Sequence, residues 1–365
     1  METVRARNKS FLRKKHKNEA LLVLNYVMDP NHYALAHQVE IVEALSRTFP
    51  KVVVITGNSK WQSNNPNLVI LSTNWMEGKN YRNIRNFYRV FALAVSEFRF
   101  TSVFSHMTVV QSGIIAPYFR LKKIKHVLWY AHAADGFLLR WASFWVNLIL
   151  TSTEGSCPIR SNKVRYLGQS IKVENFPKKH KPAYYQYKKF VHIGRLDKSK
   201  NIGMLIETVN EFRKEHSEMT LNLIGNSSNS ENKKYIAGLK NKWEKSIQEG
   251  WLIFSEAIPR ANVPMTLQDY DVFIHAFVGS LDKSLLEATL AMLPVVTINK
   301  EYHQQIGSWS KQPWDLDSEL NALFDLGDYE IQNQLELRRK LAIENHSFTN
   351  WINKLSSLLI SDNTH

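Results

Sequence analysis

The sequence predicts an α/β protein of two domains, each built on a parallel β-sheet covered by helices. The chain has 365 residues, which is too long for one ordinary core and suits two domains with a cleft between them. Short apolar runs alternate with amphipathic segments along the chain. A lysine- and proline-rich stretch without periodicity, NFPKKHKPAYYQYKK, separates two such series and is expected to be the linker.

The first series predicts a sheet with helices at 36–49 and in NIRNFYRVFALAVSEF. In the first of these helices Val39, Val42 and Leu45 recur near a period of 3.6 residues. Strands are expected at the apolar runs 21–27, 52–56, 68–72, 103–105, 126–130, 148–151 and 164–167.

The second series predicts a smaller sheet, helices at 203–215 and 282–292, and a final amphipathic helix in SFTNWINKLSSLLI. Asp282 and Ser347 are the expected N-caps of the last two. Strands are expected at 190–193, 221–224, 252–254, 272–275 and 294–298. With the boundary placed near Asn175, the expected parts are an arm (1–18), two domains (19–175 and 176–345) and a terminal helix (346–365).

Composition narrows the class of protein. The single cysteine, Cys157, excludes an intramolecular disulfide and a cysteine zinc cluster, and is expected in the core. The first 20 residues lack the apolar core of a signal peptide, and no stretch of about 18 apolar residues exists, so we expect a cytoplasmic protein. Motifs of nucleic-acid-binding domains are absent, and no nucleic acid partner is expected.

The formal net charge of +14 predicts an anionic partner, such as acidic lipid or a phosphorylated substrate. Seven lysines and arginines lie within residues 5–17. They are either an arm that touches lipid head groups on the inner face of a membrane or a solvated tail.

Phosphate-binding chemistry is indicated by FVHIGRLDKSKN, where Gly194 and Arg195 follow a strand and Lys200 precedes a helix. Ligands of such sheets bind beyond the carboxyl ends of strands, and a guanidinium with an ammonium suits a diphosphate. An exposed turn with solvated charge is the alternative.

A second candidate is FIHAFVGSLDKSLLEATLAMLPVVT. Here Gly279, Ser280, Leu281, Asp282 and Lys283 form a turn that leads into a helix, whose N-terminus can bind phosphate. The carboxylate of Glu287 can accept hydrogen bonds from both hydroxyls of a ribose, or it is an exposed helix glutamate.

Taken together, HIGRLDKSKNIGMLIETV, LNLIGN, SEAIPRANVPMTLQDYDVFI and SLLEATLAMLPVVT resemble the C-terminal domain of glycosyltransferase family 4. Looser similarity lies in NYVMDPNHYALAHQVEIVEALS, VFSHMTVV, HVLWYAH and LILTSTEGS. The resemblance implies the GT-B fold, in which two Rossmann-like domains face each other across a cleft and a C-terminal helix crosses back.

It also implies a retaining, metal-independent transfer from a nucleotide diphosphate sugar, without a cofactor, to a saccharide or lipid-linked acceptor in surface polysaccharide or glycolipid synthesis. Arg195 and Lys200 match the family's diphosphate pair, and Glu287 matches its ribose ligand. His132 matches a histidine that faces the donor sugar; a buried core histidine is the alternative.

The sequence departs from the family pattern at three places. Gly279 stands where a glutamate is common, so Asp282 or the turn amides are expected to contact the donor sugar instead. The first loop lacks paired glycines, which leaves Asn31, His32 and His37 as acceptor candidates. Gln169 replaces a histidine at the expected hinge.

Two alternatives to a transferase remain open. The missing glutamate and the basic charge suit a non-catalytic nucleotide-sugar-binding protein. A nucleotide-sugar epimerase on the same fold would need a pair of acids for proton abstraction, and no matching motif contains one.

Overall fold

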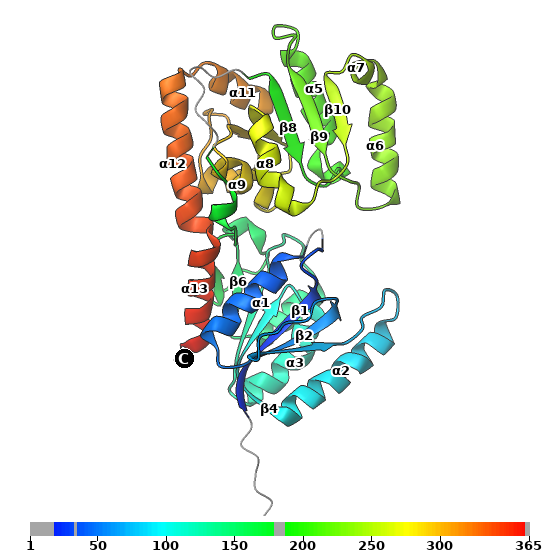
Figure 1. Ribbon diagram of the computed structural model, residues 1–365, viewed down its shortest axis with the longest axis vertical. Helices are drawn as coiled ribbons and strands as arrows, with labels where there is room; N and C mark the ends of the chain where they lie inside the picture. Colours follow the sequence, from blue (N-terminus) through cyan, green and yellow to red (C-terminus); the bar gives the residue numbers. More distant parts are fainter. Residues whose placement is uncertain (1–17, 33–34, 179–186, 362–365) are drawn as a thin grey trace, which may run out of the picture.

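The computed structural model describes residues 18–32, 35–178 and 187–361. Residues 1–17 of the expected arm (1–18) and residues 179–186 of the expected linker lie outside the described residues. Among the described residues, two parallel sheets lie one above the other (Figure 1), which confirms the predicted α/β class.

The first sheet has the strand order β3-β2-β1-β4-β5-β6-β7. Its strands are β1 (Asn18–Met28), β2 (Val52–Ser59), β3 (Leu68–Ser72), β4 (Phe98–His106), β5 (Lys125–Trp129), β6 (Leu148–Thr151) and β7 (Val164–Tyr166). Its helices are α1 (His37–Thr48), α2 (Asn80–Glu97), α3 (Val109–Leu121) and α4 (Phe137–Trp145), with short 3-10 turns η1 (Glu154–Ser156) and η2 (Val173–Asn175).

The second sheet has the order β10-β9-β8-β11-β12. Its strands are β8 (Lys189–Ile193), β9 (Thr220–Ile224), β10 (Leu252–Ser255), β11 (Val272–His275) and β12 (Val295–Thr297). The helices that follow are α5 (Ile202–Phe212), α6 (Ser230–Lys242), α7 (Glu244–Gln248), α8 (Val263–Thr266), α9 (Lys283–Leu290), α10 (Lys300–Gln305), α11 (Leu316–Phe324), α12 (Asp328–His346) and α13 (Phe348–Ile360). The 3-10 turns are η3 (Lys198–Lys200), η4 (Arg260–Asn262) and η5 (Leu267–Asp269).

Each of the twelve predicted strands is present, but β2 and β4 are longer than their apolar runs. Polar residues extend β2 because Asn58 and Ser59 still pair with Val27 and Met28 of β1. The helix predicted to reach residue 292 ends earlier, because Met292 has a left-handed backbone with φ 65°.

In both parallel sheets the order in which strands are added reverses at the first strand. β1 is flanked by β2 and β4, and β8 is flanked by β9 and β11. In open parallel sheets this switch point, at the carboxyl ends of the two central strands, is where ligands bind. The loops after β8 and β11 therefore lie where a ligand of the second sheet is expected to bind.

The terminal helix α13 packs on the first domain. Trp351, Leu355 and Leu359 are buried in the core formed by α1, β1 and β4. The side chain of Ser347 accepts a hydrogen bond from the Asn350 amide, which confirms Ser347 as the cap. Figure 1 shows α12 beside the second sheet and α13 continuing beside the first, so the end of the chain joins the two domains.

Candidate active site

The loop after β8 is held in place by the neighbouring strands. The amide of Gly194 donates to Ile224 O over 3.0 Å, and the side chain of Asn201 donates to Ala276 O over 2.9 Å. Asn201 has φ 50°, a left-handed conformation that asparagine tolerates, and it turns the chain into α5. Lys200 is thereby fixed between the ends of β8 and β11.

The ammonium of Lys200 is buried and paired with the Asp282 carboxylate. It also lies 3.6 Å from the centre of the Phe277 ring, a cation–π contact. Lys200 is therefore no solvated surface charge, and the exposed-turn alternative is wrong for it.

Asp282 occupies the N-cap position of α9, as predicted, but its side chain makes no capping hydrogen bond. The carboxylate instead accepts from His275 Nε2 over 2.9 Å, while His275 Nδ1 lies 3.2 Å from Thr297 Oγ1. Burial would raise the pKa of Asp282, but the hydrogen bond from His275 and the charge of Lys200 together lower it. Asp282 is thus the counterion of Lys200.

The ring of Phe277 fills the place of a side chain at position 279. A Cβ on Gly279 would lie 2.2 Å from Cζ of Phe277. The carbonyls of Phe277 and Gly279 both accept from the Asn299 side chain, at 2.9 and 3.2 Å. A glutamate at position 279, which is common in the family that the sequence resembles, would therefore require the Phe277 ring to move.

Arg195 lies in the same loop after β8 as Lys200, but its side chain has a different environment. Its side chain is exposed and pairs with the buried Asp197 over 3.2 Å. Asp197 is anchored in turn by the Ser228 amide, which donates to it over 2.9 Å. The structure thus provides one enclosed cation and one exposed cation at the same strand end.

The side chain of His192, next to Gly194, has a buried nitrogen without a hydrogen-bond partner among the described residues. His192 Nδ1 donates to Ile274 O over 3.2 Å, and Nε2 has no partner among the described residues. A Cβ on Gly194 would approach Nε2 to 3.2 Å. Burial lowers the pKa of His192 to about 3, so the ring is neutral.

Glu287 is buried in α9, so the exposed-glutamate alternative is wrong. Its carboxylate pairs with Arg260, which is half exposed and comes from η4. One turn earlier, the ammonium of Lys283 lies 3.4 Å from Ser170 O of the hinge. Burial and the charge of Arg260 lower the pKa of Lys283 to about 8.

The hinge touches the loop after β11. The side-chain amide of Gln169 is buried and donates to Leu281 O over 2.9 Å. The backbone amide of Gln169 donates to His346 Nδ1 over 3.0 Å. Ser280 lies in the same turn, and its carbonyl is 3.4 Å from the Asn299 side chain. Gln169 therefore connects the candidate donor loop to the joint between α12 and α13.

His132 is exposed in the loop between β5 and α4, so the core-histidine alternative is wrong. Its Nδ1 accepts from the Ala134 amide over 2.9 Å. Nothing among the described residues brings this ring into contact with Arg195 or Lys200, and its role in the reaction stays a prediction.

The structure separates the three acceptor candidates. Asn31 and His32 make contacts within their own turn, to Asp29 and Leu35. His37 lies at the start of α1, and its ring centre is 5.4 Å from that of His106 at the end of β4. His37 thus joins a polar group formed by separate elements.

Sequence reasoning missed His106, Gln38, His275 and Arg260. Gln38 lies 3.2 Å from His106 and also accepts from the Val27 amide, which links the ends of β1 and β4. Burial lowers the pKa of His106 to about 3, and the charge of Lys283 adds to this effect. Both missed histidines end a strand next to a switch point, a signal that was available in the sequence.

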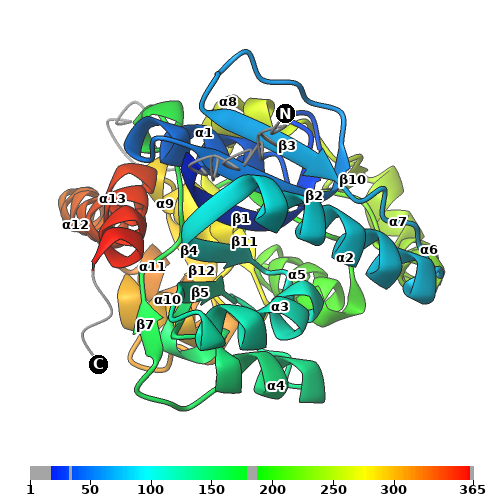
Figure 2. The same ribbon diagram turned by 90° about the horizontal axis from the view of Figure 1, so that it is seen from below.

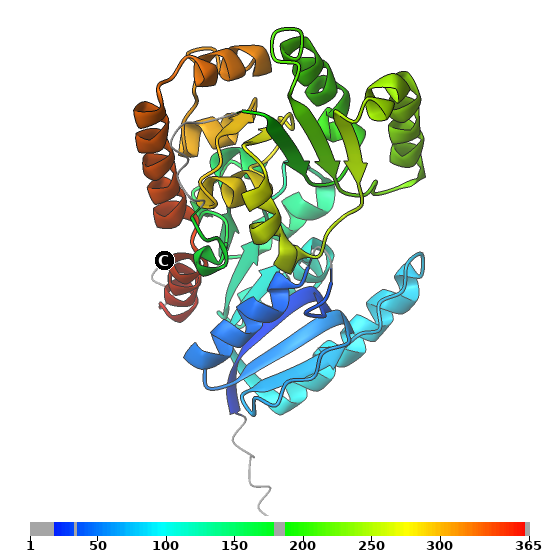
Figure 3. The same ribbon diagram turned by 45° about the horizontal axis from the view of Figure 1, so that its top comes forward.

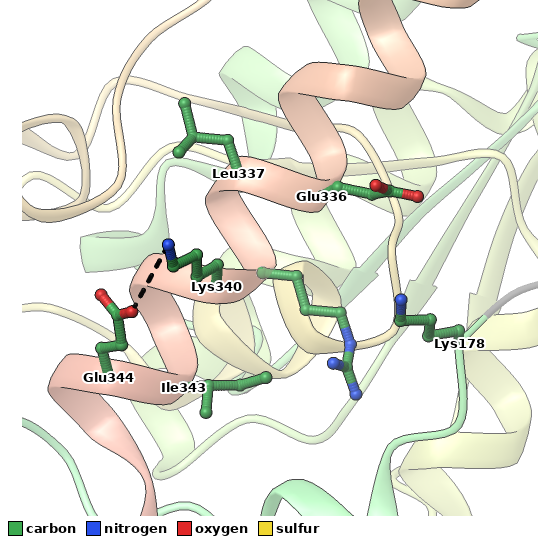
Figure 4. A pocket seen from close by; sticks show the side chains of 7 residues that line it. Lys178, Glu336, Leu337, Lys340, Ile343 and Glu344 are labelled. Atoms are coloured by element: carbon green, nitrogen blue, oxygen red, sulfur yellow. Dashed lines mark ion pairs between the residues drawn. The ribbon is translucent and has the colours of Figure 1, made fainter.

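Other surface features lie outside this group. A hollow of about 420 Å³ along α12 contains Lys340 and Glu344, whose charged groups are 3.9 Å apart (Figure 4). None of the predicted site residues lines it. Within the described ranges no cluster of three or more His, Cys, Asp or Glu could hold a metal ion.

Comparison with known proteins finds a family that resembles part of this chain. Residues 187–308 match the family described as "Glycosyl transferases group 1". This range includes Arg195, Lys200, Asp282 and Glu287. Most of the second domain is therefore similar to that of the group 1 glycosyltransferases. A search of curated proteins finds no match.

Solved structures show that the whole described chain has the GT-B fold. The Anabaena protein HepE in complex with UDP is 13% identical, with 93% of this chain and 99% of that chain covered and a TM-score of 0.70. Sucrose-phosphate synthase from Thermosynechococcus elongatus is 12% identical, with 93% of this chain and 98% of that chain covered and a TM-score of 0.72. WaaG, a glycosyltransferase involved in lipopolysaccharide biosynthesis, is 14% identical, with 93% of this chain and 100% of that chain covered and a TM-score of 0.62.

Proposed function

We propose that this GT-B protein transfers a sugar from a nucleotide diphosphate sugar, with retention of configuration and without a metal, to a saccharide or lipid-linked acceptor. The observation that carries the proposal is the enclosed ammonium of Lys200 between the ends of β8 and β11, with Arg195 on the same loop. Two cations at a switch point match the charge of a diphosphate leaving group.

The proposed role of Arg195 and Lys200 is to stabilise charge on the departing diphosphate. Preorganised charge in an enclosed site usually contributes more to such catalysis than any other single effect. The free amides at the start of α9, from Asp282 onward, would bind a phosphate oxygen. Asp282 must then share or release Lys200 when the diphosphate enters.

The remaining proposed contacts with the substrates divide between the two domains. Glu287 would accept from the ribose hydroxyls, with Arg260 holding its carboxylate in place. Gly279, Ser280, Leu281 and Asp282 would surround the donor sugar. His132 would face the donor sugar from the first domain, and His37 would lie on the acceptor side.

The proposal also includes the class of acceptor and the localisation of the protein. Similarity to WaaG, whose description names lipopolysaccharide biosynthesis, and the net charge of +14 support a lipid-linked acceptor at an anionic membrane. The described residues contain no helix long and apolar enough to cross a membrane. We propose a cytoplasmic protein that binds the membrane surface.

The test is a panel of nucleotide sugars, with release of nucleoside diphosphate as the readout. We expect Lys200→Ala and Arg195→Ala each to lower turnover by about 10²-fold or more. Lys198→Ala is the matched control, because Lys198 is exposed in the same turn and should leave turnover unchanged.

The same assay separates the alternatives. A non-catalytic binding protein would hold the nucleotide sugar and release no diphosphate in any acceptor mixture. An epimerase would change the sugar of the donor without an acceptor. Normal turnover in both the Lys200 and Arg195 variants would refute the diphosphate assignment.

A further inference from the structure

Helix α4 carries an apolar face that no other described element covers. Phe137, Leu138, Trp141 and Phe144 are 78%, 51%, 43% and 68% exposed. Spacings of three and four residues place Phe137, Trp141 and Phe144 on one side of the helix. Leu121, at the end of the adjacent α3, is 81% exposed. We call Phe137, Leu138, Trp141 and Phe144 the α4 face.

The α4 face is held rigidly. Leu139 and Ala142 are buried beneath it, and Trp141 Nε1 donates to Gly113 O of α3 over 2.9 Å. Lys163 binds the last turn of α4 through the carbonyls of Ser143 and Phe144. Figure 2 shows α3 and α4 side by side at one edge of the molecule. An ordered exposed apolar surface of this kind marks an interaction site.

Cations lie beside the α4 face. Segment 120–165 contains eight lysines and arginines but only two acids, Asp135 and Glu154. Beside α4 a hollow of about 560 Å³ is lined by Arg140, Arg160 and Lys163 together with apolar side chains, Phe144 among them. Arg140 is paired with Asp135, whereas Arg160 and Lys163 donate to backbone carbonyls, which carry no formal charge.

We propose that the α4 face and the cations around it dock on a lipid bilayer that contains acidic phospholipid. Aromatic and leucine side chains would enter the head-group region, where amphipathic helices bind, while the cations attract lipid phosphates. A second copy of this chain is the less favourable occupant, because a symmetric contact would place one basic rim against the other.

This docking would bring lipid to the candidate site. The loop that contains His132 leads directly into α4. Figure 3 shows the first domain, which carries this loop, below the second domain. On the proposed function, a lipid-linked acceptor would then enter beside His132. Bilayer binding itself requires no donor and no transfer, so it can be measured independently.

The test is flotation of the full chain with vesicles of phosphatidylcholine, with or without phosphatidylglycerol. We expect binding that depends on phosphatidylglycerol and weakens in high salt. The double variant Phe137→Ser with Phe144→Ser should bind about tenfold or more weakly. Tyr329→Ser with Leu337→Ser is the matched control, since these exposed side chains lie on α12 of the other domain and should bind as the parent chain does.

Three outcomes would overturn the proposal. The first is unchanged vesicle binding by the α4 double variant together with loss of binding in the combined variant Arg13→Gln, Lys14→Gln, Lys15→Gln and Lys17→Gln. That result would assign binding to the basic arm. The second is equal binding to vesicles without phosphatidylglycerol. The third is a dimer in sedimentation experiments without lipid that the α4 double variant dissociates. Unchanged circular dichroism verifies that each variant is folded, and donor turnover by the variants tests the proposed function separately.

Discussion

The ammonium of Lys200 and the carboxylate of Asp282 form an ion pair across 82 residues of sequence, and His275 donates to the same carboxylate. The cation expected to bind a diphosphate thus already has an anionic partner. Donor binding must work against this pair or include it.

The first prediction concerns Asp282→Asn. The neutral amide leaves Lys200 without its counterion, so the free energy of unfolding should fall by about 1–3 kcal/mol. A nucleoside diphosphate should bind more tightly, by about tenfold, because it no longer competes with a carboxylate. Calorimetric titration with UDP and thermal melts measure both effects.

The control for this variant is Glu344→Gln, which breaks an ion pair between two exposed groups and should change stability by less than about 0.5 kcal/mol. Weaker UDP binding by Asp282→Asn would show that Asp282 assists the diphosphate rather than competing with it.

The second prediction concerns the contact between Phe277 and Gly279. Gly279→Ala should lower the free energy of unfolding by about 1–3 kcal/mol, because the new Cβ forces the ring away from Lys200. In the double variant with Phe277→Ala the two costs should fall short of their sum by about 1 kcal/mol. Additive costs in urea unfolding would contradict the contact.

The third prediction is a pH dependence that comes from Lys283, whose pKa is lowered to about 8 by burial. Its ammonium loses charge as the pH rises through 8, so affinity for a nucleoside diphosphate should fall over that range. Lys283→Arg should remove the dependence, because arginine stays charged. Titrations at a series of pH values would disprove a donor role if the parent chain and the arginine variant gave parallel curves.

The same shift affects stability with the opposite sign. Between about pH 8 and the unfolded pKa of 10.5, the unfolded chain holds more protons than the folded one. The contribution of Lys283 to the free energy of unfolding should therefore rise with pH in this window. Lys283→Gln should lose this rise in urea unfolding.

The fourth prediction concerns the hinge. Gly168 has φ 80°, and a Cβ there would lie 1.8 Å from Asn345 O. Gly168→Ala should cost more than about 2 kcal/mol of unfolding free energy, since both the backbone and the space oppose a side chain. Gly238→Ala, in helix α6 with open space around it, should instead stabilise by about 0.5–1 kcal/mol. Equal effects of the two variants would refute the close packing at the hinge.

Much of the fold was predictable from local patterns. All twelve strands found among the described residues coincide with apolar runs, and Ser347 caps α13, because periodicity and capping depend on neighbours in sequence. The position of Arg195 and Lys200 after β8 follows from the same reasoning. Ends were less predictable: β2 extends over polar residues because β1 offers backbone partners there.

The sequence by itself determined the fold class and the loops that carry the candidate site, since these depend on residues close together in the chain. Only the tertiary structure decided what each side chain contacts. Asp282 had the identity and position of an N-cap, yet its carboxylate turns to Lys200 and His275. The physical reason is strand order: β11 lies beside β8, so a buried cation comes within reach of the carboxylate and outcompetes the amides of the first turn of α9 for it.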